Sequence, residues 1–97
     1  MKEAIKKALQ IAVLVYGRDK QIEMAVEEMG ELLVAISQYR RGRVAIEAVQ
    51  EEIADVKIVI GQLSLIFGED EVNNFESEKL SRLKERVAKH IQLCKTL

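Results

Sequence analysis

Residues 21–36 read QIEMAVEEMGELLVAI and residues 48–63 read AVQEEIADVKIVIGQL, and these two stretches determine the fold. In both of them, apolar side chains recur every three or four residues, which is the spacing of one face of an α-helix. Both also carry two acidic residues, three positions apart, at or inside that apolar face. The sequence therefore predicts two amphipathic helices that pack together and bring carboxylates to their contact.

Glycines divide the rest of the chain around these two stretches. Gly17, Gly42 and Gly68 each follow a periodic segment, and glycine just past the end of a helix adopts left-handed backbone angles at low cost. Asp19 and Asp70 are the predicted N-caps of the second and fourth helices. The predicted helices span residues of about 2–16, 19–41, 44–67 and 71–94.

Composition agrees with one all-α domain, residues 1–97. Of the 97 residues, 48% are hydrophobic and none is proline, and the net charge is −1. This composition favours helices and supplies a core, whereas the interspersed charges argue against a nucleic-acid partner. A single cysteine excludes an internal disulfide, and the amino terminus lacks a signal peptide, so we expect a cytoplasmic protein. No apolar run approaches the length of a membrane span, so no membrane partner is expected.

Apolar residues exceed what one contact would bury. Ile11 and Leu14 lie off the main stripe of the first predicted helix, and Val59 and Ile66 widen the stripe of the third. Such an excess of apolar surface is typical of subunit interfaces. We therefore expect a homodimer or homotetramer.

Helical phase separates four acidic residues from the others. Glu52 falls inside the apolar arc of its helix, Glu28 and Asp55 lie at the edges of their arcs, and Glu31 follows Glu28 by one turn. The acids that precede Glu28 and Glu52 in sequence point elsewhere. Each of the two helices therefore presents a pair of carboxylates on one side.

Burying unpaired carboxylates is costly, and four that converge repel one another. A divalent cation would resolve both problems, and oxygen ligands without histidine or thiolate favour Mg²⁺ or Mn²⁺ over zinc. The competing interpretation is that these residues are solvated salt-bridge formers, because acidic pairs at this spacing are common on helices.

Residues 27–32 (EEMGEL), followed by residues 52–56 (EIADV), resemble the EExxE…ExxD signature of the MazG-like, all-α nucleoside triphosphate pyrophosphohydrolases. The resemblance extends from about Tyr16 to Val87. It includes Tyr16-Gly17 and Gln21 before the first motif, the turn at residues 40–43 (RRGR), and the basic segment at residues 79–83 (KLSRL).

This resemblance implies a four-helix MazG-like bundle that dimerises, sometimes into a dimer of dimers. It implies Mg²⁺-dependent hydrolysis of a nucleoside triphosphate between its α- and β-phosphates, in sanitation or regulation of the nucleotide pool. By their match to the motif, the catalytic and metal-binding residues would be Glu28, Glu31, Glu52 and Asp55. Glu27 matches a further catalytic acid that orients water or a second metal. The residues expected to contact substrate are Lys79 and Arg82 near the phosphates and Gln21 near the base or sugar.

Other functions fit the same residues. Within the superfamily, the chain could be a phosphoribosyl-ATP pyrophosphohydrolase or a relative specific for dUTP or dCTP. A different class is a non-catalytic helical interaction module. Under that hypothesis Lys79 and Arg82 belong to a solvated basic edge that pairs with Glu78 and Glu85.

Overall fold

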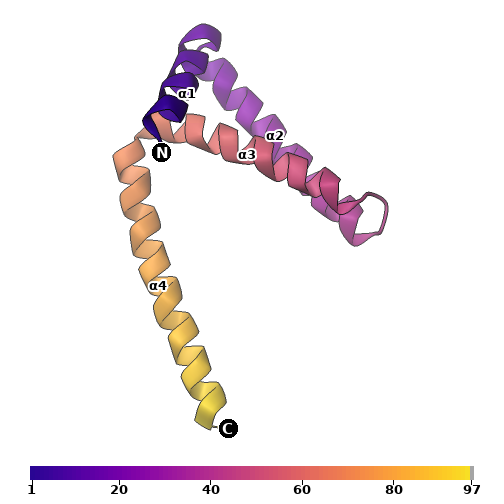
Figure 1. Ribbon diagram of the computed structural model, residues 1–97, viewed down its shortest axis with the longest axis vertical. Coiled ribbons are helices and arrows are strands. Elements are labelled where there is room, and N and C mark those ends of the chain that lie inside the picture. The colour runs from indigo at the N-terminus through magenta and orange to yellow at the C-terminus, as the bar shows by residue number, and fades with distance from the viewer. Residues whose placement is uncertain (97) are drawn as a thin grey trace. The chain divides into compact units, whose positions relative to one another are not determined.

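The computed structural model describes residues 1–96, which form four helices and no strand (Figure 1). The all-α prediction is confirmed, and every helix begins and ends within two residues of its predicted bounds. The helices are α1 (Glu3–Tyr16), α2 (Arg18–Arg40), α3 (Ile46–Phe67) and α4 (Glu69–Thr96). The first three form one compact unit, Met1–Phe67, and α4 belongs to a second unit that begins at Gly68.

The three predicted glycine breaks are present. Gly17, Gly42 and Gly68 have φ angles of 87°, 72° and 117°, which other residues rarely adopt. The predicted N-caps are wrong. Because α2 begins at Arg18 and α4 at Glu69, Asp19 and Asp70 fall inside the first turns, and Gly17 precedes α2 without a side-chain cap. Both acids instead lie near the positive end of the helix dipole.

Helices α2 and α3 form an antiparallel hairpin joined by residues 41–45. The turn is closed by backbone hydrogen bonds, in which the Arg43 N–H donates to the Gln38 carbonyl oxygen over 2.9 Å. Helix α1 contacts both helices of the hairpin. It approaches α3 closely at Gly61, where an added Cβ would lie 2.8 Å from Leu9 Cδ1.

Few side chains of the hairpin are fully buried. The buried apolar residues are Ala25, at 1% exposure, and Val59, at 5%, and the buried polar residues are Gln21 and Gln62. They share the end of the hairpin that lies near α1. Val59, which widens the predicted stripe of α3, is thus more deeply buried than the residues at the stripe's centre.

Much of the predicted apolar surface remains exposed. Leu14 on α1 is 83% exposed, Leu33 on α2 is 70% exposed and Ile53 on α3 is 44% exposed. Helices α1, α2 and α3 all contact one another, but their apolar arcs are wider than these contacts cover.

Helix α4 is amphipathic when considered alone. Its apolar seam consists of Leu80, Leu83, Val87, Ile91 and Cys94, all of which are exposed. Among the described helices, none is both long and apolar enough to cross a membrane.

Candidate metal centre

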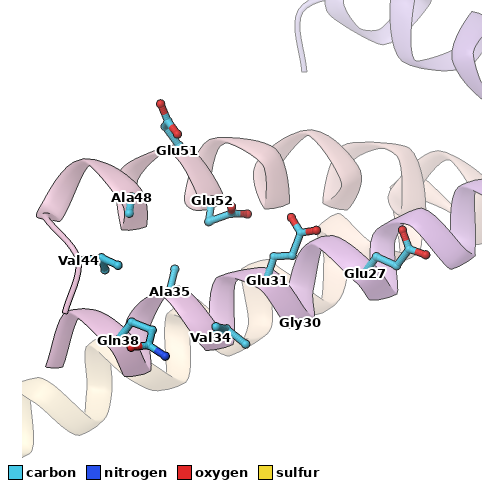
Figure 2. A pocket seen from close by; sticks show the side chains of 10 residues that line it. All are labelled: Glu27, Gly30, Glu31, Val34, Ala35, Gln38, Val44, Ala48, Glu51 and Glu52. Carbon is cyan, nitrogen blue, oxygen red and sulfur yellow. The ribbon is translucent and has the colours of Figure 1, made fainter. Parts of the chain in front are cut away.

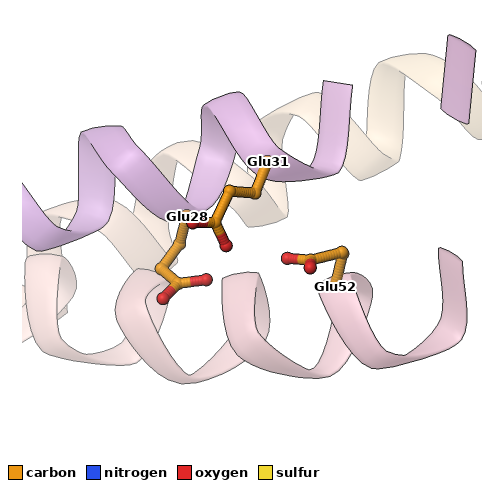
Figure 3. Close-up of side chains that lie close together, drawn as sticks. All are labelled: Glu28, Glu31 and Glu52. Atoms are coloured by element: carbon orange, nitrogen blue, oxygen red, sulfur yellow. The ribbon is translucent and has the colours of Figure 1, made fainter. Parts of the chain in front are cut away.

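Three carboxylates converge where α2 meets α3, as Figure 3 shows for Glu28, Glu31 and Glu52. One oxygen from each side chain lies within 4.8 Å of the others. Oxygens that share one divalent cation lie about 3–5 Å apart, because each is about 2.0–2.6 Å from the ion. Small rotations of these side chains would therefore suffice for all three to bind one ion.

The helices position these groups in the way that the sequence indicates. Glu28 and Glu31 are one turn apart on α2, so they share a face, and Glu52 approaches them from α3. Glu28 and Glu52 are partly buried, whereas Glu31 is exposed. The partial burial of Glu28 and Glu52 agrees with the helical phase, whereas Asp55, which the phase also places at the edge of an arc, is exposed.

Asp55 is the fourth predicted ligand and does not belong to the group of three. It is exposed, and its carboxylate is not among the oxygens that lie within 4.8 Å of one another. Its negative charge nevertheless reaches the cluster, because it contributes to raising the pKa values of both Glu28 and Glu52. Asp55 therefore lies at the margin of the cluster, close enough for its charge to act on Glu28 and Glu52.

Electrostatics make the cluster unfavourable without a counter-charge. Burial is the largest cause that raises the pKa of Glu28 above its ordinary value, followed by the charges of Glu31, Asp55 and Glu52. Burial and then the charges of Glu31 and Asp55 likewise raise the pKa of Glu52. Both effects disfavour the ionised carboxylate.

Two oxygens in the cluster lack any partner. The Oε2 atoms of Glu28 and Glu52 are shielded from solvent and have no hydrogen-bond partner among the described residues. A shielded carboxylate oxygen without a partner is costly. A bound cation would supply the missing interaction to both atoms, so the residues present fit a divalent metal.

An open groove adjoins the cluster on the side toward the α2–α3 turn (Figure 2). Its volume is about 650 Å³. Val44 lies near the turn at one end of the groove, Glu27 lies at the other end, and Glu31 and Glu52 lie between them. The complete lining is Glu27, Gly30, Glu31, Val34, Ala35, Gln38, Val44, Ala48, Glu51 and Glu52.

This groove was not among the predicted features, although the sequence carries a signal for it. Small residues occur at Gly30, Ala35 and Ala48, on the sides of α2 and α3 that line the hollow. Their short side chains leave the hollow open. The predicted catalytic residue Glu27 is exposed and belongs to this lining.

The remaining predicted site residues lie outside the metal cluster. Gln21 is only 1% exposed. Its Nε2 donates to Met24 Sδ over 3.6 Å, and its Oε1 has no partner among the described residues. Lys79 and Arg82 are exposed on α4. They line a hollow of that helix together with Glu85, Arg86 and Lys89.

Comparison with known proteins leaves the family resemblance a prediction. No protein-family model, curated protein or solved structure matches the chain.

Proposed function

We propose that this protein is a divalent-cation-dependent enzyme that hydrolyses a nucleoside triphosphate to the monophosphate and pyrophosphate. The observation that carries the proposal is the convergence of Glu28, Glu31 and Glu52, two of which have shielded oxygens without partners. Oxygen donors alone favour Mg²⁺ or Mn²⁺. The resemblance of residues 27–32 and 52–56 to the MazG-like signature supports the same reaction.

In this reaction the oxygen of a water molecule attacks the α-phosphorus. The bond from that phosphorus to the oxygen bridging it to the β-phosphate breaks, and pyrophosphate leaves with the bonding electron pair. Bound cation would neutralise phosphate charge. We assign its binding to Glu28, Glu31 and Glu52, with Asp55 as a further ligand, and we assign Glu27 to accept the proton of the attacking water.

The family resemblance assigns phosphate contacts to Lys79 and Arg82, and we include this role in the proposal. Both residues lie with two further basic residues along α4. Guanidinium and ammonium groups are the usual phosphate partners in proteins.

We further propose that the active form is a homodimer or homotetramer. The apolar residues Leu14, Val15 and Leu33 are each at least 69% exposed in the single chain. Apolar surface of this extent usually marks an interface. Sedimentation velocity at micromolar concentration tests this, and a purely monomeric species would contradict it.

Pyrophosphate release against a panel of nucleotides tests the reaction. The panel contains the common NTPs and dNTPs, including dUTP and dCTP, and phosphoribosyl-ATP, each with and without Mg²⁺ or Mn²⁺. We expect monophosphate and pyrophosphate in equal amounts, only with cation present. Release of inorganic phosphate with a diphosphate product, or no turnover of any nucleotide, would contradict the proposal.

The exposed apolar faces also favour a second candidate, a non-catalytic helical interaction module. Leu14 and Leu33 would then contact a different protein. This alternative predicts no turnover on the whole panel and no dependence of partner binding on Glu52.

A further inference from the structure

We propose that the groove between α2 and α3 binds the base and sugar of the nucleotide, and that Gln38 contacts the base. This inference rests on the proposed function, since it assigns the phosphates to the cations held by Glu28, Glu31 and Glu52. It adds the location of the uncharged half of the substrate and a residue that determines base preference.

The groove is continuous with the metal cluster. Glu31 and Glu52 belong to both the cluster and the groove lining. A nucleotide whose phosphates meet the cluster must extend in some direction along the hairpin. The groove extends from the cluster toward the turn, and its volume of about 650 Å³ lies within the usual range of small-molecule sites, roughly 300–1,000 Å³.

Farther toward α1 the hairpin is close-packed, since Ala25 and Val59 are only 1% and 5% exposed. Close-packed side chains leave no room for a ligand there. The groove toward the turn is therefore the better location for the nucleoside.

The chemistry of the groove lining also suits a nucleoside. Val34, Ala35, Val44 and Ala48 form apolar walls suited to a flat base, and no described lining residue is basic. The acidic residues that line the groove would repel a phosphate that lacks a cation. The groove therefore suits the uncharged part of the substrate.

Gln38 is the only uncharged lining residue with a polar side chain. Its amide has both donors and an acceptor, which matches the mixed donor and acceptor edge of a nucleobase. A site that forms hydrogen bonds with a substrate discriminates strongly against analogues that cannot form them. Gln38 is therefore the residue that we expect to set base preference.

Two variants test the inference. Gln38→Leu removes the amide, and Ala35→Leu fills part of the groove. The matched controls are Gln50→Leu and Ala54→Leu, which make the same changes at exposed positions outside the groove lining. The assay is Mg²⁺-dependent pyrophosphate release, measured as kcat/KM for each base, and inorganic tripolyphosphate serves as a competitive inhibitor without a nucleoside.

We expect Gln38→Leu to lower kcat/KM for the preferred base at least about tenfold and to flatten the preference among bases. Ala35→Leu should raise KM for every nucleotide. Inhibition by tripolyphosphate should stay within about twofold of wild type in both variants, which shows that the folded cluster is intact. The two control variants should behave as wild type.

Unchanged kcat/KM values and base preference in both variants would overturn the inference and leave the proposed function standing. An equal loss of tripolyphosphate inhibition and nucleotide hydrolysis would also overturn it, because the substitutions would then act on the phosphate site. Absence of turnover in the wild-type protein would instead remove the proposed function itself.

Discussion

The two ends of the α2–α3 hairpin differ in the α3 residue that lies opposite an alanine of α2. Near α1, Ala25 lies at the level of Val59, and both are buried. Near the turn, Ala35 lies at the level of Ala48, and the helices enclose a groove there. A valine fills the space that an alanine leaves, whereas two alanines do not. The size of the residue opposite each alanine thus distinguishes the packed end of the hairpin from the open end. The carboxylate cluster lies between the two ends.

The largest expected effect is the loss of activity when the carboxylate cluster, which lies between the two ends, is altered. Glu52→Gln keeps the shape of the side chain but removes a charge from the cluster. We expect pyrophosphate release to fall by more than about a hundredfold, because loss of even the partners of metal ligands costs about 10–100-fold. Glu47→Gln, the same change at an exposed position on α3, is the control. Retained activity in Glu52→Gln would remove the cluster from the mechanism.

Cation binding should stabilise both helices at this cluster. At a Mg²⁺ concentration about 100 times its Kd, stability should rise by about 2.7 kcal/mol, which is of order 10 °C in Tm for a domain of this size. Differential scanning fluorimetry measures the shift, with Glu52→Gln as the variant that should lose it. An unchanged Tm in the wild-type protein at millimolar Mg²⁺ would contradict the metal centre.

The same substitution at the two ends tests their difference directly. Ala25→Leu overfills the packed end and should destabilise the protein by about 1–3 kcal/mol. Ala35→Leu faces the groove and should change stability by less than about 0.5 kcal/mol. Urea unfolding measures both variants. Equal destabilisation would mean that the turn end is closed in solution.

Gln21 offers a smaller test of the packed end. Its Oε1 is buried without a partner, and an unsatisfied buried amide is costly. Gln21→Leu should therefore be neutral or stabilise the protein by about 1 kcal/mol, while Gln50→Leu on the surface should have little effect. A loss of more than 1 kcal/mol in urea unfolding would show that the Oε1 atom accepts a hydrogen bond in solution, for which Gln62 is the nearest candidate donor by register.

The smallest expected effect is on pH dependence. The pKa values of Glu28 and Glu52 are raised from 4.5, so the folded protein retains protons that the unfolded chain has lost. Without metal, their contribution to stability is therefore least unfavourable below pH 4.5 and worsens as the pH rises through the raised pKa values.

Thermal unfolding in EDTA from pH 4.5 to 7.5 measures this effect. The Tm of wild type relative to Glu52→Gln should fall as the pH rises, because the glutamine does not ionise. A difference that grows in favour of wild type would mean that the carboxylate of Glu52 is stabilised by a partner in the metal-free protein.

The sequence was sufficient for the four helices and for the partial burial of Glu28 and Glu52, but not for Asp55, which is exposed. Apolar spacing and three glycines determine the helices, and helical phase alone distinguishes Glu52 and Glu28 from their neighbours. It was not sufficient for the distances between helices. The packed and open ends depend on which residue of α3 opposes each residue of α2, and this register is a property of the tertiary contact. The N-caps were missed because a glycine, rather than the nearby aspartate, precedes each helix.

The exposed leucines on α1 and α2 imply that the stability of the protein depends on its concentration. The hairpin buries few apolar side chains, and its remaining apolar surface contributes to stability when a second molecule covers it, as in the proposed homo-oligomer. Folding and association would then be one equilibrium, with a midpoint that moves with protein concentration. At low concentration, the amount of the proposed homodimer or homotetramer would then rise with the square or a higher power of the concentration of the chain.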